Sequence, residues 1–348
     1  MRFSLATIAA FAAAVNAGTI LWDGRFNDMT TSAGLNAWSW SNQVGAYQYY
    51  IHGASAITSY INLASTYKNP ADSGSKQGAK FTLDSTAYWN GQTMRRTELI
   101  PQTTAAINTG KVWYHFSIKR SATNAPSIYR EHQICFFESH FTELKAGWIS
   151  GEAGTSDTAL RWDIGGVSKW STVWTADVWH NVAYEIDFTA NTVAFWHSTG
   201  SDALTLTVPA VSASTSSNGA DWHLGVLELP VSGQADTTED FYFSGVYIES
   251  GSLTTSVAGP GGAVVSGSSE SAPSSTAAAS SAPVSSAAPT TLATSTVASS
   301  SASSPTTPAA GGSLTMYSQC GGTGWTGTGT CVAGTTCKVS SQYYSQCL

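Results

Sequence analysis

Charged residues are scarce in this chain of 348 residues: Asp, Glu, Lys and Arg make up 11 % of it, and the formal net charge is −7. No run of Lys and Arg forms the basic patch that a nucleic-acid backbone requires, which argues against nucleic acid as a partner. No apolar run is long enough to span a bilayer, so we expect no membrane-embedded segment either.

Cysteine is also scarce before the C-terminal end, and the sequence motifs of esterases and of zinc enzymes are missing. Cys135 is the one cysteine before residue 320, and because the other four are expected to pair, we predict that it is a free, buried thiol. Strand alternation places it on the face opposite Glu138, alongside Gln133 and Phe137. The G-x-S-x-G motif of an esterase nucleophile does not occur. No His or Cys pair has zinc-ligand spacing outside the tail, so we expect neither a metal nor a cofactor.

The chain divides into four segments by composition. Residues 1–17 carry Arg2, a short apolar run and a Val-Asn-Ala cleavage site, the pattern of a secretory signal, so we expect an extracellular protein that starts at Gly18. Residues 18–250 are the size of one domain. Residues 251–313 are rich in Ser, Thr, Ala and Pro, which predicts a disordered, O-glycosylated linker, and residues 314–348 form a tail.

The tail holds four of the five cysteines. A segment this short cannot bury enough apolar surface to fold alone, so we expect two disulfides, for which three connectivities are possible. It has almost no aliphatic residues, and aromatic rings left on the surface of a small disulfide core suit stacking on sugar rings. Glutamine side chains can hydrogen-bond sugar hydroxyls.

Three motifs of the tail, QCGGTGWTG, CVAGTTC and YYSQCL, resemble the fungal family 1 carbohydrate-binding module over residues 316–348. The resemblance implies a cellulose-binding tail with two disulfides, Cys320–Cys337 and Cys331–Cys347. It also implies a binding face made of Trp325, Tyr343 and Tyr344, with Gln346 as a hydrogen-bonding helper.

Strand-like alternation dominates residues 18–250, and no helical period persists beyond a turn or two. In residues 111–119 it places Val112, Tyr114, Phe116 and Ile118 on one face. Residues 180–197 predict a hairpin that turns at 189–191, and residues 241–249 predict a further strand. Several such strands separated by Gly, Asn, Asp and Ser predict an all-β fold, a sandwich or jelly roll.

A cellulose-binding tail makes a polysaccharide-active enzyme the leading hypothesis, and cleavage of a glycosidic bond generally needs two carboxyl groups. In residues 93–102, alternation puts Arg96 and Glu98 on one face. In residues 130–141 it puts His132, Phe136, Glu138 and His140 on one face. The alternative for Glu98 is a buried ion pair with Arg95, Arg96 or Arg130. His223, in residues 221–230, is either a structural hydrogen-bonding group or part of the same site.

The pieces RRTEL and FFESHF, with ILWDGRFND near the start, resemble glycoside hydrolase family 131 over residues 18–250. That family consists of fungal β-glucanases with a β-jelly-roll fold. The resemblance implies hydrolysis of β-1,3-, β-1,6- and β-1,4-linked glucans. The residues implied or expected in the site are Glu98 and Glu138 as catalytic carboxylates, His223 as a third member, and Arg96, His132 and His140 as substrate contacts.

One glutamate is expected to act as acid and the other as base or nucleophile. We expect Glu138 to be the base or nucleophile and the reaction to invert the anomeric centre. The whole is then a secreted, monomeric β-glucanase whose partners are β-glucan and cellulose. Two alternatives stay open: a polysaccharide lyase of similar fold, against which the low Lys and Arg content counts, and a non-catalytic cell-wall lectin.

Overall fold

The computed structural model describes residues 18–262, 313–314, 319–322, 328–341 and 344–347. The chain separates into two compact units, residues 1–265 and residues 266–348. The expected secretory signal at residues 1–17 lies outside the described residues, as does most of the expected linker. None of the helices in the described part of the chain is both long and apolar enough to cross a bilayer.

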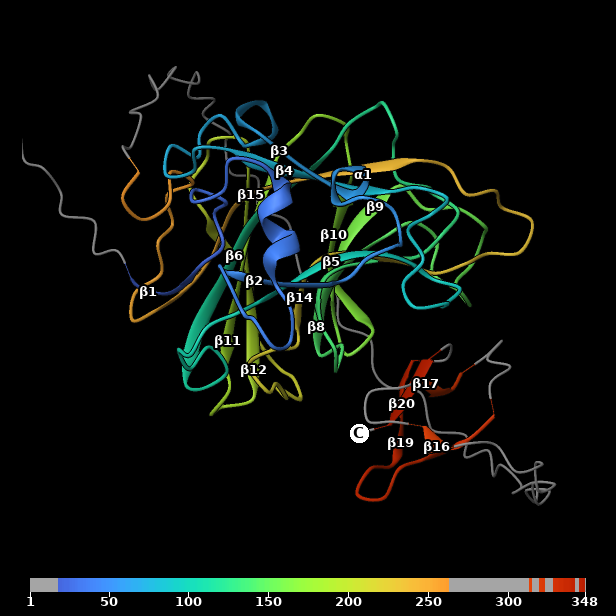
Figure 1. The fold of residues 1–348 in the computed structure, drawn as a ribbon. Coiled ribbons are helices and arrows are strands. Elements are labelled where there is room, and N and C mark those ends of the chain that lie inside the picture. The colour runs from blue at the N-terminus through green and yellow to red at the C-terminus, as the bar shows by residue number, and fades with distance from the viewer. Residues whose placement is uncertain (1–17, 263–312, 315–318, 323–327, 342–343, 348) are drawn as a thin grey trace, which may run out of the picture. The chain divides into compact units, whose positions relative to one another are not determined.

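The large unit is built almost entirely of antiparallel strands (Figure 1). Its eight-stranded sheet has the order β13-β12-β11-β6-β15-β4-β3, with β1 paired to β15. The strands of this sheet are β1 (Thr19–Asp23), β3 (Ile61–Ala64), β4 (Gly78–Leu83), β6 (Lys111–Arg120), β11 (His180–Asp187), β12 (Thr192–Thr199), β13 (Thr205–Ser212) and β15 (Glu239–Ser250).

A seven-stranded sheet packs against it, with the order β10-β9-β8-β7-β14-β5-β2. Its strands are β2 (Tyr47–Ile51), β5 (Arg95–Pro101), β7 (His132–Phe137), β8 (Thr142–Ala146), β9 (Ala159–Ile164), β10 (Val167–Val173) and β14 (Trp222–Glu228). The helical elements are single short turns: η1 (Ser32–Ala37), α1 (Ile57–Tyr60) and η2 (Ser65–Tyr67). The prediction of an all-β sandwich is therefore confirmed.

Alternation of apolar residues explains why these strands form and which way they face. The four apolar residues predicted on one face of residues 111–119 are all buried in the core, on β6. The predicted hairpin is β11 followed by β12, paired from His180↔Thr199 to Asp187↔Thr192. Asp187 closes its turn by accepting hydrogen bonds from the backbone of Thr189 and Ala190, and Asn191 adopts the left-handed backbone that such turns require (φ 53°).

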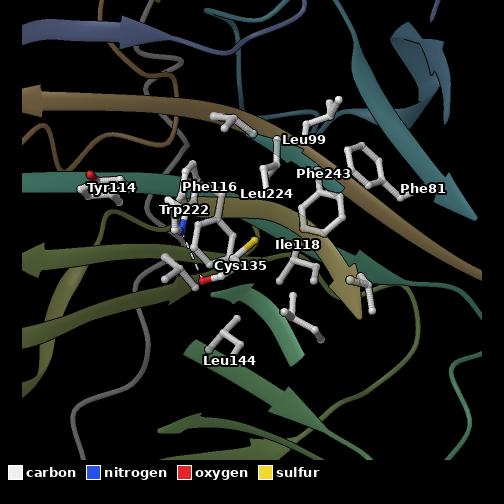
Figure 2. Packing of buried hydrophobic residues seen from close by; sticks show 14 of the residues in the cluster. Phe81, Leu99, Tyr114, Phe116, Ile118, Cys135, Leu144, Trp222, Leu224 and Phe243 are labelled. Atoms are coloured by element: carbon white, nitrogen blue, oxygen red, sulfur yellow. Dashed lines mark hydrogen bonds between the residues drawn. The ribbon is translucent and has the colours of Figure 1, made fainter. Parts of the chain in front are cut away.

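The core lies between the two sheets and contains the free thiol. Cys135 is completely buried and is not in a disulfide, and Figure 2 shows it among the rings of Phe116 and Trp222. The Trp222 indole donates a hydrogen bond of 3.3 Å to the carbonyl of Cys135. Burial raises the pKa of the thiol, which leaves it protonated and unreactive.

The compact domain continues past the expected boundary at residue 250. Residues 251–262 fold back along it: Thr254 and Ala258 are buried, and the Arg25 guanidinium donates to the carbonyl of Pro260 at 2.9 Å. The backbone of Leu204 donates to Thr255 at 2.8 Å. Composition placed this stretch in the linker because its small residues are the same as those that follow.

The small unit holds short strands and both disulfides. Its strands are β16 (Ser313–Leu314), β17 (Gln319–Gly321), β18 (Thr330–Cys331), β19 (Cys337–Ser341) and β20 (Tyr344–Cys347). The disulfides join Cys320 to Cys337 and Cys331 to Cys347, the pairing that the family 1 resemblance implies. Of the expected cellulose-binding residues, Trp325 and Tyr343 lie outside the described residues, and only the backbone of Tyr344 and Gln346 is described, within β20.

Candidate active site

Three adjacent strands in the middle of the seven-stranded sheet, β5, β14 and β7, bring the predicted acidic residues together. In the pairing of β14 with β5, Gly225 lies opposite Glu98. In its pairing with β7, His223 lies opposite Phe136. Side chains that alternate away from the core on these strands share one surface, which we call the outer face of the sheet. Glu98, His223 and Glu138 meet on this face, although they lie far apart in the sequence.

Glu98 is the most enclosed member of the group. Its side chain is fully buried and accepts two hydrogen bonds from the Arg96 guanidinium, at 2.7 and 2.9 Å. It also accepts a bond of 2.5 Å from Nδ1 of His223. Burial alone would raise the pKa of Glu98, but the charges of Arg96 and His223 outweigh it and hold the pKa below its ordinary value. Glu98 is therefore an ionised carboxylate with both oxygens bonded.

His223 stands between the two carboxylates. Nδ1 faces Glu98, and Nε2 lies 3.1 Å from Oε2 of Glu138. Carboxylates only accept hydrogen bonds, so the ring must donate from both nitrogens, which requires the imidazolium form. Burial would lower the pKa of His223, but Glu98 and Glu138 raise it to about 9. The ring is fixed by stacking on Phe136, with centroids 4.5 Å apart.

Glu138 is the one of the three that reaches solvent. It directly follows β7, and its backbone N–H donates to the carbonyl of Asp221 at 2.9 Å. Its side chain is 25 % exposed, compared with 3 % for His223. Burial would raise the pKa of Glu138, but its bond to the His223 imidazolium lowers it. We call Glu98, His223 and Glu138 the carboxylate–imidazole trio; with Arg96 its formal charge is zero.

His132 does not belong to this face, and the prediction that it shares a face with Phe136 and Glu138 is wrong. Cys135 has a left-handed backbone (φ 48°), and the pairing of β14 with β7 shifts by one residue at this point. Ile134 and Cys135 therefore both point into the core, and the alternation of β7 changes phase there. Gln133, expected beside Cys135, instead donates to Glu131 at 3.1 Å.

His132 lies in a separate ionic network between the two sheets. Its Nε2 is 2.7 Å from Glu239 on the opposite sheet, and both side chains are fully buried. Burial would lower the pKa of His132, but Glu239 and Glu228 raise it to about 10. Arg95 donates to both glutamates, and Arg130 donates to Glu228. The ion pairs with Glu98 that were considered for Arg95 and Arg130 are therefore made with Glu228 and Glu239, and Arg96 is the partner of Glu98.

Within the described part of the large unit, this network also contains three side chains whose spacing could suit a metal ion. Ligand atoms of His132, Glu228 and Glu239 lie within 4.8 Å of one another. The two guanidinium groups of Arg95 and Arg130 already neutralise these carboxylates, so the site carries no excess negative charge to attract a cation.

His140 contacts the same Phe136 ring as His223 and leads to polar residues that the sequence analysis missed. Its ring stacks on that of Phe136, with centroids 5.1 Å apart, and its Nδ1 is 3.1 Å from Oε2 of Glu143. Glu143 and Lys145 on β8 and Asp163 on β9 are all buried. In the sequence these polar residues alternate with the apolar Leu144 and Trp162, and this pattern could have identified them as one face of two strands. Burial raises the pKa of Asp163 to about 6.

On the other side of the trio, the Arg96 guanidinium lies over the ring of Trp89, 5.4 Å from its centroid. The sequence analysis singled out no tryptophan in residues 18–250. Trp89 sits in a loop before β5 where no alternation marks it.

Comparisons with known proteins identify the families that the two units match. Residues 20–254 match the family described as "Glycoside hydrolase 131 catalytic N-terminal domain", and residues 316–344 match "Fungal cellulose binding domain". The structure of a GH131 beta-glucanase catalytic domain from Podospora anserina is 75 % identical, with a TM-score of 0.69; the match covers 70 % of this chain and all of that one. The catalytic domain of a family 131 protein from Coprinopsis cinerea is 50 % identical, with a TM-score of 0.66, over 71 % of this chain and all of that one.

A curated relative matches over a short stretch of the chain. Endoglucanase-5 of Hypocrea jecorina is 68 % identical over 34 residues, which are 10 % of this chain and 14 % of that protein. This match therefore covers only a small part of the relative. The family match over residues 20–254 covers more than half of the chain, and we conclude that the chain belongs to glycoside hydrolase family 131.

Proposed function

We propose that the large unit hydrolyses β-linked glucans and that Glu138 is the carboxylate that contacts the substrate. The observation that carries this proposal is the trio: one carboxylate at the surface, joined through an imidazolium to a second carboxylate that is completely buried. Membership of family 131 and the similarity to a protein described as a beta-glucanase support the substrate class. The β-1,3, β-1,6 and β-1,4 linkages are proposed from the family resemblance.

Glu138 suits the role of base. The neighbouring imidazolium holds its pKa well below the ordinary value, so the carboxylate is ionised at neutral pH and can accept a proton from the attacking water. Glu98 cannot touch a sugar in this arrangement because it is fully buried and both its oxygens are bonded. We therefore assign Glu98 a positioning role: it fixes the ring of His223 and keeps it charged.

We propose from the family resemblance that the reaction inverts the anomeric centre, with Glu138 as the base that activates the attacking water. Proton NMR of the first product formed would show the anomer opposite to that of the substrate.

The decisive experiment compares the full chain with its Glu138→Gln variant on soluble laminarin, lichenan and cello-oligosaccharides. We expect new reducing ends from the native chain and a loss of at least about a hundredfold in the variant. Near-normal hydrolysis by the variant would refute the role of Glu138. Products that absorb as unsaturated sugars would indicate a lyase, and binding without turnover by the native chain would indicate a lectin.

For the rest of the chain we propose export followed by attachment to cellulose. The signal pattern at residues 1–17 supports secretion, and domains of this kind are typical of secreted fungal enzymes. The match of residues 316–344 to a fungal cellulose binding domain, together with the two disulfides, supports a cellulose-binding tail whose contacts are Trp325, Tyr343, Tyr344 and Gln346. The protein is proposed to act as a monomer.

A further inference from the structure

Four aromatic side chains pack together at the β2 edge of the seven-stranded sheet. They are Trp38, Trp40, Tyr50 and Trp89, which we call the aromatic cluster. The rings of Trp38 and Tyr50 stack with centroids 5.7 Å apart, and Trp40 lies 4.9 Å from each of them. Tyr50 in turn contacts Trp89, at 5.9 Å. The cluster is therefore continuous from Trp40 to Trp89.

One side chain joins the aromatic cluster to the carboxylate–imidazole trio. Arg96 covers the ring of Trp89 and at the same time donates two hydrogen bonds to Glu98. The strand order places this connection in space: β2 pairs with β5, and β5 pairs with β14, which carries His223. The aromatic cluster thus lies on one side of the trio across the strands, and Phe136 and His140 lie on the other.

The exposure of Trp40 is not explained by the fold. This side chain is 67 % exposed, whereas Trp38 next to it is 8 % exposed. A large apolar ring held in water gains nothing for stability, and an exposed aromatic surface of this kind usually marks a binding site. Trp40 is also absent from the core between the sheets, where most of the large aromatic residues of this domain pack.

The segment that carries Trp40 is held in place rather than loose. Ser39 and Asn42 exchange two backbone hydrogen bonds, of 2.9 and 3.0 Å, which close a tight turn around Trp40. The indole of Trp38 donates to Oε1 of Gln102 at 2.5 Å, and this anchors the start of the turn to the end of β5. A ring presented in this way is pre-organised for a flat partner, so little conformational entropy is lost on binding.

We propose that the aromatic cluster is a glucosyl-binding subsite, in which Trp40 stacks on the apolar face of a sugar unit of the same β-glucan chain that is cut at Glu138. The proposal rests on the glucanase function proposed above and adds a direction: the bound chain runs across the strands from Trp40 past Arg96 to the trio. Aromatic rings offer the flat apolar surface that the C–H faces of glucose fit, and the buried Arg96 guanidinium, held by Glu98, packs over the ring of Trp89 at the inner end.

The test compares how chain length affects the binding of two full-length proteins, Glu138→Gln and Glu138→Gln with Trp40→Ala. Both keep the tail, so any binding by the tail cancels. Titration with a β-glucan trisaccharide and hexasaccharide should show that Trp40→Ala lowers the affinity ratio of hexamer to trimer about tenfold, which equals about 1.4 kcal/mol. Trp40→Phe should recover most of this loss because it restores a flat ring.

The exposed Leu206→Ala on β13, in the other sheet, is the matched control and should leave the ratio unchanged. An unchanged ratio in Trp40→Ala, or equal losses for both sugars, would overturn the proposed subsite. The same variants made in the active chain separate this inference from the function. If the native chain cuts no β-glucan, the function fails; if it cuts and Trp40→Ala leaves the KM for the hexamer unaltered, the subsite alone fails.

Discussion

The buried pair of Arg96 and Glu98 allows the positioning role of Glu98 to be tested quantitatively. In Glu98→Gln the side chain keeps its shape but loses its charge, and the amide NH2 replaces one acceptor. Because Arg96 and His223 donate three hydrogen bonds to Glu98, at least one donor would then face another donor. Arg96 would keep its charge at 4 % exposure after the carboxylate charge opposite it is lost.

Breaking a buried ion pair by removing one partner costs about 3–5 kcal/mol. We expect the lower end, about 3 kcal/mol, because the amide oxygen still accepts one bond. For a domain of this size that corresponds to a fall in Tm of about 6–12 °C. Urea unfolding of the full chain measures the change. The control is Asp177→Asn, whose partner Lys119 lies 3.4 Å away at a surface where Asp177 is 64 % exposed; we expect a change below about 1 kcal/mol.

Glu98→Gln should also lower the pKa of His223 from about 9, because Glu98 makes the largest favourable contribution to the imidazolium. A group whose pKa is raised in the folded state stabilises the fold fully below its unfolded pKa, about 6.5 for His, and loses this contribution as the pH rises through its folded value. The native protein should therefore lose stability between about pH 6.5 and 9, and the variant over a narrower range. NMR titration of His223 checks the shift.

Replacing both Arg96 and Glu98 by Met distinguishes electrostatics from packing. Without either charge the stability should return towards that of the native chain, while hydrolysis should be lost because His223 has no buried carboxylate to fix its ring. An unchanged pKa of His223 in Glu98→Gln, with a loss of stability below about 1 kcal/mol, would refute the reasoning.

Three further outcomes are expected. A chain that ends at residue 262 should keep its rate on soluble β-glucan and lose its retention on crystalline cellulose in a pull-down assay; equal losses on both would contradict the division of roles. His132→Gln should lower the free energy of unfolding by about 3 kcal/mol but leave KM unchanged, because His132 pairs with Glu239 inside the sandwich and does not face substrate; a raised KM in a folded variant would restore it to the site. Cys135→Ala should keep full activity and should no longer react with a thiol reagent after unfolding, and a loss of hydrolysis in the folded variant would show a role for the thiol.

The sequence predicted the strands well because their side chains alternate, and alternation is a local property. It also singled out Glu98, Glu138 and His223, which the fold brings together. Their connection could not be predicted in this way, because it depends on β14 lying between β5 and β7, a pairing of distant segments. Local alternation left both an ion pair and a catalytic role open for Glu98, and the fold shows that its carboxylate is in an ion pair with Arg96.

Three other features had no usable local signal. A left-handed backbone is ordinarily adopted by Gly or Asn, and a cysteine gives no reason to expect it at position 135. The alternation of β7 was therefore extended without interruption to His132, which put His132 on the wrong face. Trp40 and Trp89 lie in loops, where side chains do not alternate between two faces, so the sequence does not predict which way they point. The end of the domain was placed too early because Thr254 and Ala258 fill small spaces without the apolar run that marks a strand.

The change of phase at Cys135 has a consequence for how this domain can vary. It divides β7 into two halves with different contacts. The first half, with His132, is bonded to Glu239 of the opposite sheet, and the second half, with Phe136, stacks on the ring of His223. Substitutions before Cys135 should mainly alter tolerance to heat and urea, and those after it should mainly alter the reaction. Substitutions at one end of a single strand can then change the stability of the domain, and substitutions at the other end can change catalysis, with little effect of either on the other property.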